Sequence, residues 1–327
     1  MNHVQHILQN KQNLENRWKI IRFIREFFWN ENFTEVETPL LLHVPGQEPY
    51  LDPMKVLFQN ENGDNYTGYL HTSPEYTLKK MLSAGYTQIF SLSKCFRSGE
   101  SFGGTHNPEF TLIEWYRTGV DFTALMDDVE KLCFELGNIF KKEIHFKRMS
   151  MKDIWKEILN CNLDELLTTD SIKEFCVQKG YHIGKDERYE DMFYRIFLNE
   201  IEPKLEQMGN IIIHHYPAQM AALAKLDDGD NRYAERFEVY MNGMEIANAF
   251  SELTDAKEQR KRFLEEQEIR EKLGKERIEI DEEFIQAIDI LPKSAGIALG
   301  VDRLVQVLLD CKNINNVLTL PMSKLIS

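Results

Sequence analysis

Residues 96–116 read FRSGESFGGTHNPEFTLIEWY, and this stretch decides the expected fold. A glycine-rich turn carrying Arg97 separates apolar segments at 89–96 and 110–117, which predict two antiparallel strands. Arg97 offers a permanently charged fork for a phosphate, and Phe110 offers a flat face for a purine. This combination predicts a triphosphate-binding loop. The alternative for any single residue is an exposed hairpin with a polar tip.

The composition is that of a globular chain without a broad nucleic-acid surface. The 327 residues are 43% hydrophobic, which allows one large core or a core with a small satellite. Lys and Arg total 39 against 53 Asp and Glu, so clustered cations that would hold nucleic acid non-specifically are not expected. The five cysteines lack metal-ligand spacing, which fits a reducing compartment. With no apolar run of about 18 residues, we expect a cytoplasmic protein without membrane contact.

The N-terminal part of the chain predicts one helix and several short strands. Apolar residues recur every three or four positions over 14–28, with Trp18 among them, which indicates a helix with one buried face. Short strands are expected at 33–39 and around 55–59. A further strand from Tyr69 is expected to end where a helix begins.

The start of that helix is marked by three residues. Ser73 is placed to cap it, Pro74 suits its first turn, and Glu75 complements the positive end of its dipole.

The rest of the chain predicts helices that alternate with buried strands. The expected helices lie at 122–140, 254–273 and 281–290, the middle one highly charged and solvated; the expected strands lie at 210–215 and 293–300, the last followed by a helix to 309. We expect residues 1–327 to form one catalytic domain with a helical insertion at 141–209. The alternative for the insertion is simply more helix covering the core.

Residues 236–252 predict a hairpin with two acidic residues on one face. Asn242-Gly243 between apolar runs is a strong hairpin signal, and a two-residue turn there pairs Glu238 with Ala247. Glu238 and Glu245 then lie as diagonal neighbours, and two such carboxylates repel unless a cation lies between them. Mg²⁺ held together with phosphate fits this arrangement, and a solvent-facing pair is the alternative.

Under strict alternation of side chains, Asn248 and Glu252 of this hairpin point to the face opposite Glu238 and Glu245. If Asn248 and Glu252 belong to the same site, the second strand must bulge or end near Ala249. Near the C-terminus, small residues at Gly296, Ala298 and Gly300 allow close approach of a ligand.

These blocks resemble class II aminoacyl-tRNA synthetases. The first helix, strand and Pro39 look like motif 1, residues 96–114 like motif 2, and residues 296–304 like motif 3. HNPEFT and FEVY with the Asn-Gly turn are similar to the lysyl branch. The resemblance implies an α+β fold, the class II catalytic core, with a mainly antiparallel sheet flanked by helices.

Within that branch the chain is more similar to the elongation factor P lysine ligases. Lysyl-tRNA synthetases carry an N-terminal anticodon-binding domain, whereas motif 1 here begins near the first residue. Ala298 stands where lysyl enzymes generally have glycine, and its methyl group could favour an amine on the β-carbon. Ala249 in place of a glycine and a motif 2 loop one residue longer, with Gly99 before Glu100, depart from the lysyl pattern.

The resemblance implies a ligase that activates lysine or (R)-β-lysine with ATP and Mg²⁺ and transfers it to a lysine of elongation factor P. It also implies a homodimer, and tRNA is not the expected acceptor. Arg97 and Arg303 are the implied catalytic residues, with Glu238 and Glu245 on the metal. The implied nucleotide-binding residues are Arg97, Ser98, Gly99, Glu100, His106, Asn107, Phe110, Glu245, Ile246, Gly300 and Arg303. The implied substrate-binding residues are Ser73, Pro74, Glu75, Tyr116, Asn248, Glu252 and Ala298.

Three alternatives remain open from the sequence. They are a minimal lysyl-tRNA synthetase that charges tRNA, an ammonia-dependent amide ligase that activates aspartate, and a non-catalytic regulatory paralogue.

Overall fold

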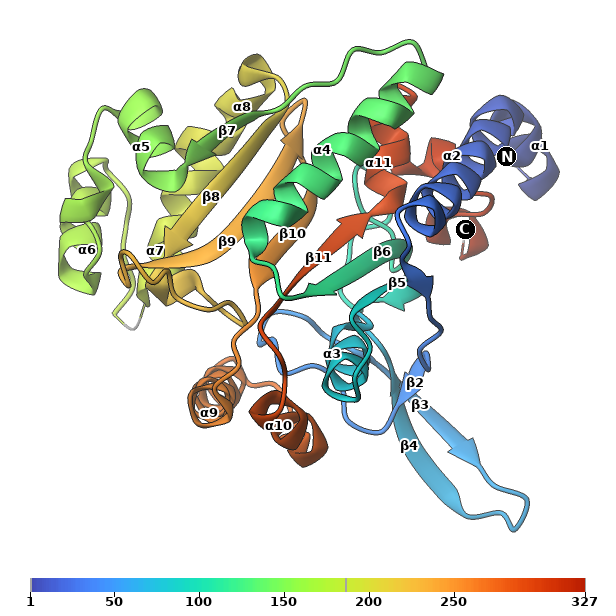
Figure 1. Cartoon of the computed structure of the whole chain (residues 1–327), viewed down its shortest axis with the longest axis horizontal. Coiled ribbons are helices and arrows are strands. Elements are labelled where there is room, and N and C mark those ends of the chain that lie inside the picture. The colour runs from blue at the N-terminus through green and yellow to red at the C-terminus, as the bar shows by residue number, and fades with distance from the viewer. Residues whose placement is uncertain (1, 186, 327) are drawn as a thin grey trace. The chain divides into compact units, whose positions relative to one another are not determined.

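A computed structural model describes residues 2–185 and 187–326 (Figure 1). The chain divides into two compact units. The first unit comprises Met1–Gly119 and Thr254–Ser327, and the second comprises Val120–Leu253.

The first unit contains four strands in the order β1-β5-β6-β11. β5 (Gln88–Phe96) and β6 (Glu109–Thr118) are antiparallel, so the two strands predicted around the glycine-rich loop are confirmed. β11 (Ser294–Gly300) runs antiparallel to β6, and β1 (Thr34–Glu35) pairs parallel with β5. β1 has two residues where a strand over 33–39 was expected, because Pro39 and its neighbours leave the ladder early.

One face of these strands packs against α2 (Lys11–Asn30), which confirms the predicted N-terminal helix. Phe28 lies with its ring centroid 5.0 Å from Phe90 and 4.9 Å from Trp115. Trp18, expected on the buried face, is 55% exposed, and Ile20 is buried instead. The period identified the helix, but Trp18 lies outside its buried stripe, which is formed by Leu14, Arg17, Ile20, Ile24, Phe27 and Phe28.

The remaining elements of the first unit surround this sheet. A separate three-stranded sheet has the order β2-β4-β3, formed by β2 (Leu41–Leu42), β3 (Met54–Gln59) and β4 (Asn65–Leu70). The helices are α1 (His3–Gln9), α3 (Glu75–Ser83), α9 (Ala256–Lys272), α10 (Glu282–Asp289), α11 (Val301–Leu308) and α12 (Met322–Leu325), with a short 3₁₀ turn η4 (Ile314–Val317).

Two helices of this unit differ from expectation. Pro74, not Ser73, occupies the N-cap of α3, although Ser73 Oγ still accepts a hydrogen bond from the Glu75 N–H at 3.0 Å. α9, expected to be solvated, buries Phe263, whose ring lies 5.9 Å from that of Tyr76. Apolar residues are too sparse in α9 for its buried face to show in the sequence.

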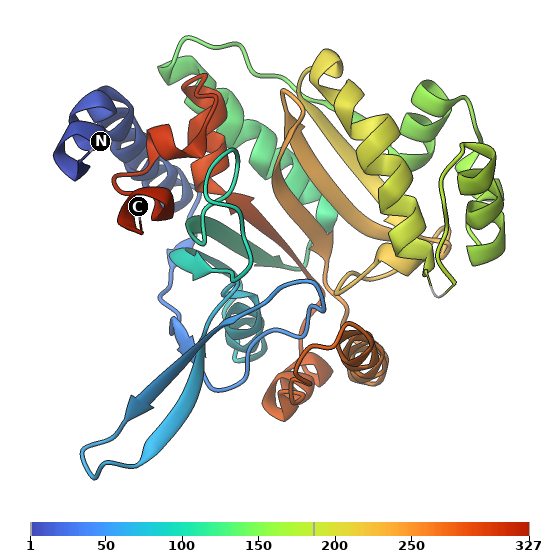
Figure 2. The same ribbon diagram turned by 180° about the vertical axis from the view of Figure 1, so that it is seen from behind.

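The second unit contains strands in the order β10-β9-β8-β7 with helices on both faces. The strands are β7 (Lys147–Ser150), β8 (Ile211–Pro217), β9 (Tyr233–Met241) and β10 (Met244–Ser251). α4 (Phe122–Ile139) covers one face, and α7 (Tyr189–Ile196) and α8 (Glu202–Met208) lie on the other, as Figures 1 and 2 show. The remaining elements are α5 (Met151–Leu159), η1 (Leu163–Glu165), α6 (Thr169–Gln178), η2 (Phe197–Ile201) and η3 (Ala218–Met220). Residues 141–209 are thus mainly helical but include β7.

The β9–β10 hairpin has the predicted turn and a different register beyond it. Asn242 and Gly243 have φ of 50° and 77°, as a two-residue turn that follows the strand twist requires. The register shifts between Glu245 and Ala247, so Glu238 pairs with Asn248 and the predicted Glu238–Ala247 pairing is wrong. Ile246 is the extra residue of a β-bulge.

Candidate active site

The face of β5, β6 and β11 opposite α2 carries the polar residues of the first unit. Glu114 and Tyr116 of β6 pair with Ala298 and Gly296 of β11. Directly paired residues of antiparallel strands point to the same face. This face therefore holds Glu114, Tyr116 and Ala298 side by side.

Glu114 is the most deeply buried acid of this face. It has no exposed surface, and its carboxylate accepts hydrogen bonds from Ser73 Oγ at 2.7 Å and from the Tyr116 hydroxyl at 3.1 Å. Burial and the nearby charge of Glu75 raise the pKa of Glu114 to about 8, against the effect of Lys79 and the two hydrogen bonds. A cationic ligand group would lower that pKa and receive a buried counter-charge.

Glu114 was not among the residues predicted to bind substrate. The signal that could have found it is an acid within the apolar run TLIEWY, at the same strand parity as Phe110 and Tyr116.

Glu75 opens α3 beside this acid. Its carboxylate lies 2.5 Å from Lys79 Nζ, and Lys79 is 1% exposed. The buried ammonium therefore offsets one of the two negative charges at this end of the site.

The glycine-rich loop places Arg97 over Phe110. The guanidinium carbon lies 4.9 Å from the ring centroid, and Arg97 Nε is buried without a hydrogen-bond partner among the described residues. A planar cation held against an aromatic face with an unsatisfied donor suits an oxyanion ligand.

Arg303, in the first turn of α11, lies against the same loop. Its Nη2 is 2.9 Å from His106 Nε2, and its Nε donates to the Thr105 carbonyl at 3.3 Å. Burial and the charges of Arg303 and Arg97 lower the pKa of His106, opposed by Glu100, which lies 3.8 Å away. A neutral His106 can accept the hydrogen bond from Arg303.

The C-terminal segment fixes this loop from outside. The Gly104 carbonyl accepts hydrogen bonds from Ile314 N at 2.8 Å and Gln306 Nε2 at 3.3 Å. Asn107 Oδ1 accepts from Met322 N at 2.9 Å. The first unit thus brings Arg303, which is distant in the sequence, to the loop that carries Arg97, His106, Asn107 and Phe110.

In the second unit, Glu238 lies in a buried network of donors. Its carboxylate accepts from Arg236 Nη2 at 2.7 Å, the Tyr216 hydroxyl at 2.6 Å and the Tyr240 hydroxyl at 2.7 Å. Arg236 Nε also donates to Asn248 Oδ1 at 3.2 Å. Arg236 and the two tyrosines were not predicted, although the alternation in RFEVY would place Arg236, Glu238 and Tyr240 on one face.

The bulge at Ile246 turns Glu245 and Asn248 to the face that carries Glu238. Glu245 pairs with Tyr240, and Asn248 pairs with Glu238. The sequence required a bulge or strand end near Ala249 if Asn248 and Glu252 share one site; the structure has a bulge at Ile246, nearer the turn.

The other predicted site residues occupy defined places. Glu252 is 2% exposed and forms a β-bridge with Ala224. Ser98 is exposed and forms a β-bridge with Asp52. Gly300 caps α11 and pairs with Leu112. Within residues 2–185 and 187–326, no group of three or more His, Cys, Asp and Glu side chains is arranged to hold a metal.

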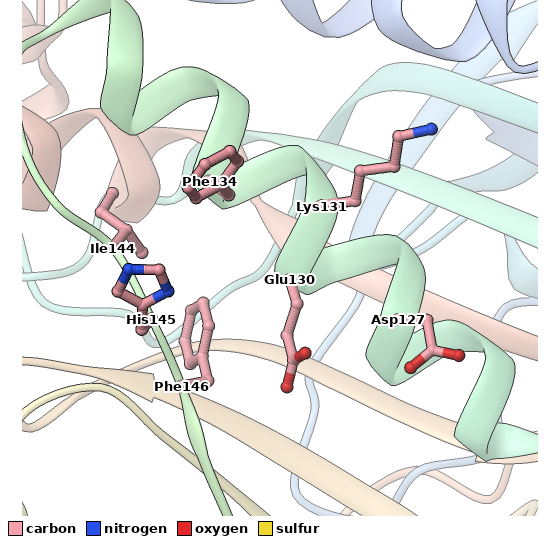
Figure 3. Close-up of a pocket in the computed structure, with 7 residues that line it drawn as sticks. All are labelled: Asp127, Glu130, Lys131, Phe134, Ile144, His145 and Phe146. Atoms are coloured by element: carbon pink, nitrogen blue, oxygen red, sulfur yellow. The ribbon is translucent and has the colours of Figure 1, made fainter.

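A cavity of about 340 Å³ lies along α4 in the second unit (Figure 3). Its lining includes Glu130, Phe134, His145 and Phe146, and Arg148 binds Glu130 through two hydrogen bonds of 2.8 and 3.0 Å. None of its lining residues was predicted to bind substrate. No helix in the described part of the chain has the length and apolarity needed to cross a membrane.

Comparisons with known proteins agree with this architecture. The family model of class II tRNA synthetases (D, K and N) matches residues 5–324, which confirms the predicted fold class. Similar proteins named elongation factor P (R)-β-lysine ligase come from Histophilus somni, with 38% identity over 311 residues, and Haemophilus influenzae, with 37% over 322 residues. The alignments cover 94% of this chain and 94% of the first relative, and 98% and 97% for the second.

Proposed function

This chain belongs to the elongation factor P (R)-β-lysine ligase family of class II synthetases, and from that premise we propose that it joins lysine or (R)-β-lysine to elongation factor P. The enzyme is an ATP-dependent ligase of the class II type. The observation that carries the substrate assignment is Glu114, a buried carboxylate poised beside Glu75 to receive an ammonium group.

The first step is adenylation of the amino acid. A carboxylate oxygen of the substrate attacks the α-phosphorus of ATP, and the bond to pyrophosphate breaks. Arg97, with an unsatisfied Nε, is suited to screen the repulsion between the two anions. Two contacts of Arg303, with the Thr105 carbonyl and the His106 ring, are to neutral groups, and a phosphate oxygen would form a stronger charge-assisted bond than either.

The amino-acid pocket is proposed to lie on the sheet face of the first unit. Glu114, with Tyr116 and Ser73 as its donors, would bind the side-chain ammonium, and Glu75 would bind the amine near the reacting carboxylate. A buried carboxylate without a partner costs about 3–5 kcal/mol, so an amino acid without a matching cation is rejected.

Mg²⁺ is proposed to bind Glu238 and Glu245. A carboxylate has about four acceptor positions, and Glu238 uses three of them on protein donors, so one remains for a metal. Glu245 is half-buried on the same face. The ion would supply positive charge for the phosphates, since Mg²⁺ prefers one or two carboxylates together with substrate oxygens.

The second step is transfer to the protein. The neutral ε-amine of a lysine on elongation factor P attacks the adenylate carbonyl carbon, the bond to AMP breaks, and the amine proton is released. We place this reaction in the cytoplasm, where the partner would be present during translation.

The test combines two assays. ATP–pyrophosphate exchange is measured with α-lysine and (R)-β-lysine, and modification of elongation factor P is followed by mass spectrometry. We expect exchange with at least one isomer and a mass increase of one lysyl group. Efficient charging of tRNA at ordinary salt, without modification of elongation factor P, would reverse the assignment.

We also propose a homodimer built on the N-terminal helices. Exposed apolar side chains gather on α1 and α2: Val4 and Leu8 are 65% exposed, Trp18 is 55% exposed and Trp29 is 51% exposed. Exposed apolar residues on neighbouring helices support the proposal that this surface is covered in the dimer. Light scattering should give a molar mass twice that of the chain. In Trp18→Glu the molar mass should fall to that of a single chain.

A further inference from the structure

A loop that the function has not yet used lies against the proposed amino-acid pocket. Gln47 N is bonded to the Tyr76 hydroxyl of α3 at 3.2 Å, and Ser98 N donates to the Asp52 carbonyl at 2.7 Å. The loop is therefore tied at one end to the helix that begins with Glu75 and at the other to the residue after Arg97. Glu48 lies between these two anchors.

One oxygen of the Glu48 carboxylate has no hydrogen-bond donor among the described residues. This oxygen, Oε2, is buried. The charged neighbours of Glu48 include Glu75, Arg97, Lys79 and Glu266, and Lys79 is already held by Glu75 at 2.5 Å. Burial and the charge of Glu75 raise the pKa of Glu48, while Arg97 and Lys79 act in the opposite direction.

The charges around this point match a diamino acid. Glu48, Glu75 and Glu114 contribute three carboxylates, and Lys79 offsets one of them. A fourth buried acid near Glu48 and Glu75, Glu266, has Arg262 as its own cation. Arg97 is assigned above to the substrate carboxylate and α-phosphate. Two negative charges then remain, which equals the number of ammonium groups on lysine or β-lysine.

We propose that Glu48 is a specificity-determining residue that binds, together with Glu75, the substrate amine nearest the reacting carboxylate. This inference rests on the proposed function. Moving that amine from the α- to the β-carbon shifts it by about one carbon–carbon bond, 1.5 Å. Two adjacent carboxylates can hold the shifted amine, whereas Glu75 alone suffices for the amine of α-lysine.

A substitution at Gly46 provides an independent way to move the Glu48 carboxylate without removing its charge. A Cβ at position 46 would lie 2.3 Å from Glu48 Oε2, too close for the present side-chain position. Gly46 does not have a positive φ, so its backbone accepts alanine. Gly46→Ala should therefore displace the Glu48 side chain while the loop stays anchored.

The experiment compares the wild type with Glu48→Gln, Gly46→Ala and the control Glu61→Gln, which removes an exposed charge from a turn. ATP–pyrophosphate exchange is measured for (R)-β-lysine and α-lysine. We expect both pocket variants to lower kcat/KM for (R)-β-lysine by about tenfold or more, as loss of one charge-assisted hydrogen bond would. In the same variants, kcat/KM for α-lysine and the KM for ATP should change less than about threefold. Glu61→Gln should match the wild type in all three quantities.

The outcomes separate this inference from the proposed function. A wild type that exchanges pyrophosphate with neither isomer refutes both. A wild type that is active, with variants in which the ratio between the two isomers is unchanged, refutes the role of Glu48 alone. An equal fall for both isomers, with a lowered melting temperature, assigns Glu48 a structural role and also overturns the inference.

Discussion

Arg17→Met tests whether one buried ion pair holds the catalytic elements of the first unit together. Arg17 Nη1 in α2 lies 2.5 Å from Asp302 Oδ1 in α11, and the two side chains are 7% and 3% exposed. Arg17 Nη2 donates to Thr111 Oγ1 of β6 at 3.0 Å, and Thr111 N donates to Asp302 Oδ2 at 2.9 Å. Asp302 directly precedes Arg303, so this triad also sets the start of the helix that carries Arg303, the arginine proposed to bind phosphate.

The expected loss of stability follows from the charge left behind. Removing one partner of a buried pair costs about 3–5 kcal/mol because the remaining charge is uncompensated. In Arg17→Met, Asp302 keeps the Thr111 N–H but loses its counter-ion. The double variant Arg17→Met/Asp302→Asn should recover part of this loss, since no charge then remains buried.

The assay is urea unfolding followed by circular dichroism, together with pyrophosphate exchange. The matched control is Arg22→Met on the same helix, because the Arg22 side chain is 81% exposed and its ion pair is with Glu26 on the surface. Arg17→Met should unfold at much lower urea and raise the KM for ATP, while Arg22→Met should do neither. If the two variants unfold within about 1 kcal/mol of each other, or the double variant is less stable than either single one, the reasoning fails.

Three further perturbations follow from single sites. The pKa of Glu114, about 8 against an ordinary 4.5, means that the unfolded chain ionises first, so stability should fall as pH rises from about 4.5 to about 8. Melting curves should show a shallower fall in Glu114→Gln, and an unchanged slope would contradict the assignment. Glu238→Gln leaves buried Arg236 without its counter-charge and should cost about 3–5 kcal/mol in urea unfolding, with weaker Mg²⁺ dependence of exchange. Gly243→Ala adds a Cβ at φ 77° and 3.1 Å from Glu206 N, so it should destabilise the chain by about 1–2 kcal/mol in thermal unfolding.

The hairpin of β9 and β10 shows what sequence patterns can and cannot predict. Asn242-Gly243 specifies its turn locally, because both residues accept a positive φ. The bulge at Ile246 has no such local mark: neither glycine nor proline stands nearby beyond the turn. Two constraints set the position of the bulge. The Asn242-Gly243 turn fixes one end of the strand, and Asn248, farther along, must point to the buried face. Only the second constraint depends on the rest of the fold.

Buried charges were the least predictable part of the site. Arg17 and Glu114 each stand inside an apolar pattern that correctly predicted a helix or a strand. A charge is buried only when partners meet it, and Asp302, Ser73 and Tyr116 come from other elements of the fold. Periodicity gives the face of each residue but not the partner across the interior.

The family model includes enzymes for aspartate and asparagine as well as lysine, and the charge of this pocket separates these substrates. Phe110 and Glu114 are four residues apart on one strand, so about 13 Å separates the aromatic face beneath Arg97 from the buried acid. A substrate whose carboxylate meets Arg97 directs its side chain toward that acid. Aspartate has no side-chain cation to neutralise Glu114 and would add another negative charge to the pocket, whereas a long side chain ending in an ammonium would neutralise it. Aspartate should therefore fail to support pyrophosphate exchange even at high concentration, and exchange stimulated by aspartate would mean that Glu114 does not face the substrate.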